Sequence, residues 1–326
     1  MEFKWVRWRE VLVFFLFMGG LLGAFNGITP FLYRALPNDY ARMRLIVSTL
    51  KGENGKPDIV VFGNSRGMSG VDGYAMEREL AGNPRVYNLT STGQRLSESA
   101  LYYSSLPTST RAVIQCVDLD QLRVPIDLDT PNKVALRMYG YAMDEFTREL
   151  LPALAEPLGE PLFLRNYEAR NCLFTGLTTF LRNRLDDDVA PGVTNTDLRY
   201  PNATLSDRNE VVYQRGVAER NAGDTFGSYR ILPEWKRLID RSALYFKERG
   251  IAYYLVLMPY NPDIKALRPD DKRAAARLFA RTFNTVPVID CVDLLESSDF
   301  YDAIHPNRKG AEKITARIIQ ALSRPV

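Results

Sequence analysis

The chain has 326 residues, of which 46% are hydrophobic and 25% charged, and a formal net charge of +3. This length suits one large domain or two modest ones, and the composition excludes general disorder. The small net charge, together with the absence of a basic tract, argues against a nucleic-acid partner.

Cysteine and histidine usage limits the chemistry further. Cys116, Cys172 and Cys291 are far apart and form no Cys-x-x-Cys pair, so we expect no metal site, no redox site and no cofactor. Three buried free thiols fit this spacing better than one disulfide with a spare thiol. His305 is the single histidine, so any mechanism that needs an imidazole must use it.

Residues 1–35 predict a membrane anchor. The basic, tryptophan-containing stretch MEFKWVRWRE precedes roughly 20 mostly apolar positions, enough to cross the hydrocarbon core as a helix. The basic flank places the N-terminus in the cytoplasm. Residues 36–326 would then form a periplasmic or extracellular domain of a single-pass protein of the cytoplasmic membrane. A cleaved signal peptide and a buried core helix are the alternatives, although no Ala-x-Ala-like site lies near residues 22–30.

Apolar segments rich in β-branched residues alternate with amphipathic segments along the remaining chain. We expect strands at 58–65, 85–90, 111–119, 251–260 and 286–294, and helices at 71–81, 97–106, 232–250, 270–283 and 308–322. This alternation predicts an α/β domain with a parallel five-stranded sheet covered on both faces. Residues 120–230 break the pattern, and we interpret them as a loop-rich insertion between the third and fourth strands that serves as a lid or a docking surface.

The first strand ends in a candidate nucleophile. Four apolar residues lead into the sequence GNSRG, in which Ser65 is the central residue. Gly-x-Ser-x-Gly after a strand is the nucleophile-elbow pattern of α/β-hydrolases. A glycine-flanked serine is also an ordinary turn between a strand and a helix, so the pattern alone does not decide.

The candidate base lies near the C-terminus. Asp302 and His305 are separated by two residues and precede the last predicted helix. A histidine base needs an acceptor on its other ring nitrogen, which fixes the tautomer and stabilises the imidazolium form. We therefore expect Ser65, His305 and Asp302 to act as nucleophile, base and acid. An ordinary surface histidine is the alternative reading of His305.

The chain order of these residues resembles that of the SGNH (GDSL-type) hydrolase superfamily. In α/β-hydrolases the acid and the histidine lie on separate loops, whereas here they share one loop before the last helix. The blocks in common are Gly63-Asn64-Ser65, Gly93 after the second strand, and Asp302-Ala303-Ile304-His305. The resemblance covers about residues 57–119 and 231–322, and it implies a flavodoxin-like SGNH fold.

The chain departs from this family after the third strand. The family's third block, Gly-x-Asn-Asp, supplies an asparagine to the oxyanion hole, but the corresponding VIQCVDLDQL at 113–122 has no asparagine. The oxyanion would then rest on the backbone N–H groups of Ser65 and Gly93. Losing one donor typically costs about 2.7–4 kcal/mol of transition-state stabilisation. Asn64, Arg66 and a group within 118–121 are the candidates to replace it.

Some of these assignments have simpler alternatives. Gly93 would also serve merely to allow a positive φ in a loop. Arg66 would either bind a substrate anion or pair with a carboxylate. Tyr260 and Asn261 follow the fourth strand at the carboxyl edge of the sheet, where ligands gather in open α/β folds, but their segment MPYNPD is also a plain turn.

The missing asparagine, the anchor and the insertion narrow the resemblance to membrane-anchored SGNH-like proteins of cell-envelope acylation. That group includes the D-alanyl transfer proteins of teichoic acid modification and the alginate O-acetylation proteins. The resemblance implies a serine O-acyltransferase that acylates an exported or cell-envelope polysaccharide through an acyl-Ser65 intermediate, beside a membrane-bound O-acyltransferase partner. An envelope carbohydrate esterase with the same triad and a non-catalytic assembly subunit are the alternatives.

Overall fold

The computed structural model describes most of the chain outside the expected insertion. The described residues are 8–35, 40–52, 55–127, 144–151, 198–199, 208, 210–223, 229–265 and 268–323. Most of the segment 120–230, including Cys172, therefore lies outside the described residues.

The described residues form a five-stranded sheet in which all neighbouring strands are parallel. Its strands are β1 (Ile59–Phe62), β2 (Val86–Asn88), β3 (Ala112–Val117), β4 (Ala252–Leu257) and β5 (Val288–Asp290). Their order is β2-β1-β3-β4-β5, so the sheet is open and doubly wound. The predicted α/β class and the parallel five-stranded sheet are confirmed, and each strand lies inside its predicted segment.

Helices connect the strands. They are α1 (Trp8–Ala35), α2 (Tyr40–Leu50), α3 (Ser65–Gly70), α4 (Gly73–Glu79), α5 (Leu96–Ala100), α7 (Glu145–Leu150), α10 (Glu210–Asn221), α11 (Pro233–Glu248), α12 (Pro269–Thr282) and α13 (Arg308–Leu322). The five helices predicted for the domain correspond to α4, α5, α11, α12 and α13. Helices α2, α3, α7 and α10 were not predicted. Helix α3 was not predicted because its sequence, SRGMSG, contains two glycines and two serines, which have a low helix propensity.

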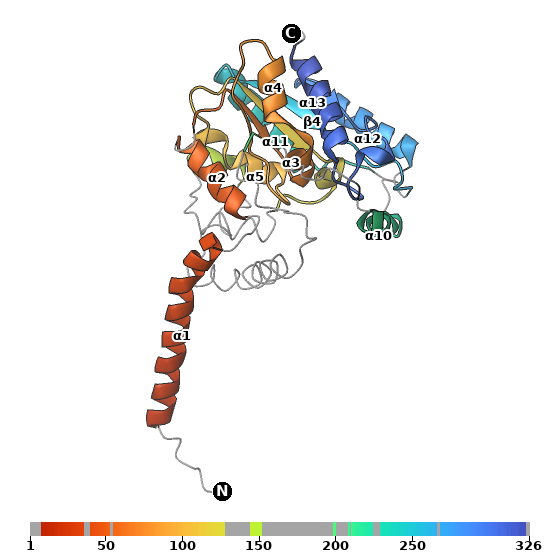
Figure 1. The fold of residues 1–326 in the computed structure, drawn as a ribbon. Coiled ribbons are helices and arrows are strands. Elements are labelled where there is room, and N and C mark those ends of the chain that lie inside the picture. Colours follow the sequence, from red (N-terminus) through yellow and green to blue (C-terminus); the bar gives the residue numbers. More distant parts are fainter. Residues whose placement is uncertain are drawn as a thin grey trace.

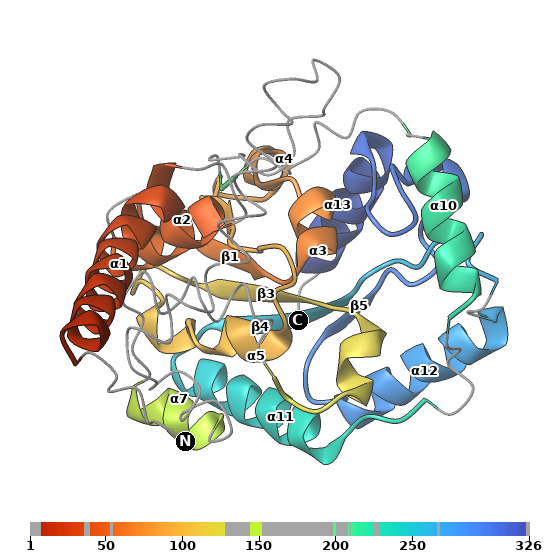
Figure 2. The same ribbon diagram turned by 90° about the horizontal axis from the view of Figure 1, so that it is seen from below.

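The helices cover both faces of the sheet. Figure 2 shows α5 and α11 on one side and α3, α4 and α13 on the other. The buried residues of α2, Met43, Ile46 and Leu50, belong to the core on the α11 side. Strand β1 follows this division: Val60 and Phe62 belong to the core on the α11 side, whereas Ile59 and Val61 belong to the core on the α13 side. This alternation is what period-2 side-chain geometry requires of a central strand buried on both faces.

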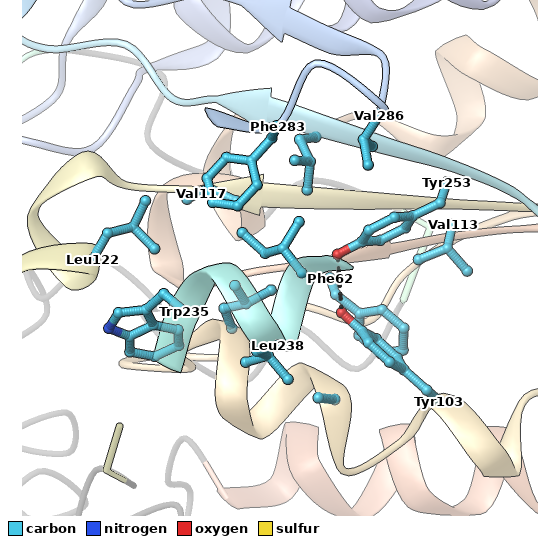
Figure 3. Packing of buried hydrophobic residues seen from close by; sticks show 14 of the residues in the cluster. Phe62, Tyr103, Val113, Val117, Leu122, Trp235, Leu238, Tyr253, Phe283 and Val286 are labelled. Atoms are coloured by element: carbon cyan, nitrogen blue, oxygen red, sulfur yellow. Dashed lines mark hydrogen bonds between the residues drawn. The ribbon is translucent and has the colours of Figure 1, made fainter. Parts of the chain in front are cut away.

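Aromatic residues fill the core on the α11 side (Figure 3). Tyr103 donates its hydroxyl to Gln115 Oε1 at 3.0 Å and lies 3.4 Å from the hydroxyl of Tyr253. Burial raises the pKa of Tyr103 well above its ordinary value, so the phenol stays neutral. Trp235 is fully buried and donates its indole N–H to the carbonyl of Val124 at 2.7 Å. The chain that follows β3 is thereby fixed to the core.

Helix α1 stands apart from the domain (Figure 1). Its 28 residues span about 42 Å at 1.5 Å per residue. The stretch Trp8–Phe25 has a mean hydropathy of 1.6, and none of it is buried inside the protein. The helix is therefore long and apolar enough to cross a membrane, and it is not a buried core helix. A signal sequence near the N-terminus can meet the same criteria of length and apolarity.

Candidate active site

Three side chains from distant parts of the chain form one hydrogen-bonded series. His305 Nε2 lies 2.8 Å from Ser65 Oγ, and His305 Nδ1 lies 2.8 Å from Asp302 Oδ2. Ser65 and His305 are 240 positions apart in sequence, and all three residues are partly buried. The structure thus brings the predicted nucleophile, base and acid together. In such a series the imidazole accepts the hydroxyl proton, and the carboxylate stabilises the imidazolium that forms.

The serine is presented by a sharp turn between β1 and α3. Gly63 has a φ of 146°, and a Cβ added there would lie 2.7 Å from Cβ of Cys116 on β3, so the position requires glycine. Asn64 then caps α3, because its Oδ1 accepts the backbone N–H of Arg66 at 3.0 Å. Ser65 is the first residue of α3, so its own backbone N–H has no partner within the helix.

The acid and the base share one short loop. Asp302 Oδ1 accepts the backbone N–H groups of Ile304 and His305, each at 2.8 Å, which leaves Oδ2 for the imidazole. The backbone N–H of Tyr301 donates to the carbonyl of His305 at 2.9 Å and closes the loop. Burial alone would raise the pKa of Asp302, but the hydrogen bonds from His305 outweigh it, so the pKa lies below its usual value. The carboxylate is therefore ionised at neutral pH.

Asn64 and Arg66 both bind Asp118, which directly follows β3. Asn64 donates its side-chain N–H to Asp118 Oδ2, and Arg66 Nη1 lies 3.2 Å from Asp118 Oδ1. Arg66 and Asp118 are only 6% and 7% exposed. Burial alone would lower the pKa of Arg66, but Asp118 raises it, and the net pKa is raised. Asn64 and Arg66, both predicted to contact substrate, therefore bind Asp118 in this structure. Asp118 lies in the segment 113–122, which corresponds to the Gly-x-Asn-Asp block of the family.

The ring of Tyr260 packs against the guanidinium of Arg66. The guanidinium carbon of Arg66 is 4.8 Å from the centroid of the Tyr260 ring, and the Tyr260 hydroxyl donates to Asp120 Oδ2 at 3.3 Å. Burial raises the pKa of both Tyr260 and Asp120, and Arg66 opposes this rise. Tyr260 is only 2% exposed, so in this structure it packs against Arg66 inside the protein and is not a surface contact.

Asn261 connects two loops of the site. The hydroxyl of Tyr213 donates to Asp263 Oδ2 at 2.7 Å and lies 3.1 Å from Asn261 Oδ1. The side-chain N–H of Asn261 donates to the carbonyl of Ala303 at 3.3 Å. The residue is 1% exposed. In this structure Asn261 therefore positions the loop that carries Asp302 and His305.

Gly93 lies in the loop that follows β2. Its φ of 69° is in the left-handed region that favours glycine. Ser91 in the same loop donates its backbone N–H to the carbonyl of Gly63 at 3.1 Å, which ties the loop to the turn before Ser65. The N–H of Gly93 has no hydrogen-bond acceptor among the described residues.

The loop of Gly93 is held by a residue that the sequence did not predict. Arg42 on α2 is 3% exposed, and it donates to the carbonyls of Thr90 at 2.6 Å and of Asn88 at 2.7 Å. The side chain of Asn88 in turn donates to the carbonyls of Gly67 and Val71, which fixes α3. No sequence pattern pointed to Arg42. Asp118, in contrast, belongs to the segment 118–121 that the sequence indicated, because it directly follows a predicted strand.

Among the residues that the structure describes, no group of three or more His, Cys, Asp or Glu side chains has a metal-binding arrangement. Cys116 and Cys291 are buried free thiols. Burial raises the pKa of Cys291 to about 12 and that of Cys116 further, so both stay protonated and unreactive at neutral pH.

The chain was also compared with known proteins. No protein-family model matches it, and a search of curated proteins found no significant match. Its function is therefore inferred from the geometry of the site and from the sequence motifs.

Proposed function

We propose that the protein is a membrane-anchored serine O-acyltransferase of the SGNH type that acylates an exported or cell-envelope polysaccharide through an acyl-Ser65 intermediate. The observation that carries the proposal is the hydrogen-bonded series of Ser65, His305 and Asp302. The strand order 2-1-3-4-5, which is that of flavodoxin-like folds, supports it as well. In such sheets ligands bind at the carboxyl edge near the β1/β3 switch point, where Ser65 lies.

In the first half-reaction Ser65 takes the acyl group from a donor ester or thioester. Its Oγ attacks the acyl carbonyl carbon while His305 Nε2 accepts the hydroxyl proton. The tetrahedral intermediate then collapses, and the imidazolium returns that proton to the leaving oxygen or sulfur of the donor. The products are the acyl-Ser65 ester and the free donor alcohol or thiol. Asp302, ionised at neutral pH because its pKa is lowered, stabilises the imidazolium between these steps.

In the second half-reaction an acceptor hydroxyl replaces the donor. His305 removes its proton, the acceptor oxygen attacks the ester carbon, and the proton passes to Ser65 Oγ as the ester bond to the enzyme breaks. The result is an O-acylated glycan and the regenerated serine. The kinetics should be ping-pong, with a covalent intermediate on Ser65.

The oxyanion of both half-reactions is proposed to bind the backbone N–H groups of Ser65 and Gly93. The side-chain amide of Asn64 is held in another role, because it donates one N–H to Asp118 while its Oδ1 accepts the N–H of Arg66. With two donors instead of three we expect slow turnover on simple esters, since one donor is typically worth about 2.7–4 kcal/mol.

The anchor supports a donor that is delivered from the membrane. Helix α1 and helix α10 lie on the same side of the domain, opposite to the C-terminus (Figure 1). Helix α2, which follows α1, contacts through Arg42 the carboxyl end of β2, at the catalytic edge. This arrangement suits a membrane-bound O-acyltransferase as the partner that supplies the acyl group, and a domain on the outer side of the cytoplasmic membrane.

Hydrolysis is the second candidate function. The side chains of Asp302 and His305 are 20% and 25% exposed, so water also reaches the base and would convert the same intermediate into free acid. An envelope carbohydrate esterase would use this route. Analysis of the products formed from an acyl donor with and without a glycan separates the two: acylated glycan supports transfer, and free acid alone supports hydrolysis.

Labelling of Ser65 tests whether the site is catalytic. A fluorophosphonate probe should modify Ser65 in the full chain, whereas Ser65→Ala and His305→Ala should abolish labelling. The exposed Ser105 gives a matched control, since Ser105→Ala should label as the unmodified chain does. In cells, unchanged polymer acylation by Ser65→Ala at normal protein levels would instead support a non-catalytic assembly subunit.

A further inference from the structure

The triad loop, residues 300–306, carries the acid and the base and is closed at its two ends by a local bond. The backbone N–H of Asn307 donates to the carbonyl of Asp299 at 2.8 Å. Ala303 lies midway along the loop, between the acid and the base. The local bond fixes the ends of the loop, whereas the position of its middle depends on the contacts that Ala303 makes with other elements.

Two elements distant in sequence contact Ala303, which is 4% exposed. The side chain of Asn261 donates an N–H to its carbonyl at 3.3 Å. Helix α10 lies beside the loop that leads into α13 (Figure 2). A Cβ added to Gly216 of this helix would lie 2.9 Å from Cβ of Ala303, closer than the 3.4–4 Å of an ordinary contact. Because the Cβ of an alanine is fixed to the backbone, a methyl group at position 216 requires α10 or the triad loop to move.

Helix α10 is itself bonded to the segment that follows β4. Tyr213, about one turn before Gly216, donates its hydroxyl to Asp263 Oδ2 at 2.7 Å and lies 3.1 Å from Asn261 Oδ1. Asn221, at the end of the helix, donates its side-chain N–H to the carbonyl of Asp263 at 3.2 Å. These bonds lie on both sides of Gly216 along the helix and resist a shift of α10. A methyl group at position 216 should therefore displace the triad loop.

The contact with Ala303, and not the helix, accounts for a glycine at position 216. Gly216 lies inside α10, where glycine has a lower helix propensity than alanine. It is not among the glycines with a positive φ, so its backbone conformation suits any residue. The three atoms nearest to an added Cβ all belong to Ala303. Alanine at this position should thus favour the helix and disturb the loop.

We infer that α10 positions the catalytic base, and that the contact of Gly216 with Ala303 holds the triad loop where the imidazole of His305 reaches Ser65. This inference rests on the proposed function, because it explains how the geometry of the Ser65 site is set. His305 Nε2 lies 2.8 Å from Ser65 Oγ, and proton transfer needs about 2.6–3.2 Å. A misplacement of about 1 Å can cost about 10²-fold in rate, so a smaller shift of the loop still has a measurable effect.

Labelling kinetics of the full chain in detergent test the inference. Gly216→Ala should lower the rate constant for fluorophosphonate labelling of Ser65 about tenfold or more, while the melting temperature stays the same or rises. For hydrolysis of a soluble ester, kcat should fall by a similar factor with little change in KM, because the substitution displaces the base. A residue that only stabilises the fold would lower the melting temperature together with the rate.

Ala303→Gly provides the rescue. It removes the methyl group that the new Cβ would meet, so the Gly216→Ala/Ala303→Gly protein moves one methyl group from the triad loop to α10. Residues in contact are not additive, and we expect the double variant to recover most of the labelling rate that Gly216→Ala loses. If the losses of the two single variants simply multiply, the contact does not position the loop and the inference is overturned.

Gly223→Ala is the matched control. It makes the same change just beyond the end of α10, where an added Cβ would lie 3.4 Å from the carbonyl oxygen of Arg220, an ordinary contact. It should label as the unmodified chain does, and equal rates for Gly216→Ala and Gly223→Ala would overturn the inference. If Gly216→Ala lowers the melting temperature, Tyr213→Phe becomes the informative variant. It keeps the buried ring and removes the donor to Asp263, so labelling should slow; an unchanged rate would overturn the inference.

The two proposals fail in different ways. If the unmodified chain is not labelled at Ser65, the proposed function is contradicted, and the inference fails with it. If the unmodified chain and Gly216→Ala are labelled at the same rate, the proposed function stands and only the positioning role of α10 is overturned.

Discussion

The two halves of the triad are held in different ways. On the serine side, α3 is fixed by bonds between distant residues: Asn64 and Arg66 reach Asp118 across 54 and 52 positions. On the histidine side, Asp302 bonds to residues two and three positions away. The nucleophile therefore depends on the tertiary structure of the buried sheet, whereas its base depends mainly on one local loop.

This difference predicts different consequences of mutation. Removing a partner on the serine side leaves a buried charge or a buried carbonyl unpaired, so stability and activity should fall together. Removing a partner on the histidine side leaves a partly exposed loop that water can solvate, so activity should fall with little loss of stability. The following substitutions test this contrast.

Asp302→Asn should give the largest change in activity. Asparagine keeps an oxygen that accepts the N–H groups of Ile304 and His305, so the loop should fold as before. It no longer stabilises the imidazolium, and the same change in a Ser-His-Asp protease lowers kcat about 10⁴-fold. Ester hydrolysis and thermal melting, measured on one preparation, check this prediction. If the melting temperature fell together with the activity, the histidine side would not depend mainly on one local loop.

Asp118→Ala should give the largest change in stability. Arg66 would be left charged and unpaired at 6% exposure, and breaking a buried pair in this way costs about 3–5 kcal/mol. Labelling of Ser65 should fall as well, because Asn64 and the first turn of α3 lose the same anchor. Urea unfolding of the full chain in detergent provides the measurement.

A surface ion pair provides the control for that experiment. Lys236 and Asp240 pair along α11 with side chains 51% and 41% exposed. Asp240→Ala should therefore cost only about 0.3–0.5 kcal/mol. If Asp118→Ala were as mild as Asp240→Ala, the buried pair would not hold the nucleophile.

Arg42→Met should lower the turnover number more than it changes KM. Two carbonyls of the Gly93 loop would lose their donor, and the N–H of Gly93 would be placed less accurately for the oxyanion. We expect kcat for a soluble ester to fall about tenfold or more, by analogy with loss of an oxyanion-hole donor. Arg44→Met is the matched control, because Arg44 is exposed on the same helix. Similar kinetics for the two variants would remove Arg42 from the site.

Much of the fold and the triad could be predicted from the sequence because both depend on local patterns. Apolar runs ended by small or polar residues predicted the strands. The spacing of Asp302 and His305 predicted that they could bond to each other within one loop. Their order relative to Ser65 then placed all three at the same edge, since the strands of the sheet are parallel. Each of these steps needs only neighbouring residues and the geometry of a parallel sheet.

The partners of the site residues could not be predicted in this way. The sequence offered Arg66 as a ligand for an anion or as half of an ion pair, but many carboxylates were available to it. Only the packing of α3 against the end of β3 selects Asp118. Helices α2 and α10 were missed, and with them Arg42 and Tyr213, because their contacts with the site are made by tertiary packing.

The smallest expected effect is the pH dependence of stability on the histidine side. The pKa of Asp302 is lowered in the folded protein, so its contribution to stability is present above the unfolded pKa near 3.9 and is lost as pH falls through the folded pKa. The difference in melting temperature between the unmodified chain and Asp302→Asn should therefore be small at pH 6 and shrink as pH falls below the unfolded pKa. Because the carboxylate is partly exposed, solvent screening limits this difference. A difference that stays constant between pH 6 and pH 3 would mean that the loop is stabilised by its backbone bonds alone and not by the charge of Asp302.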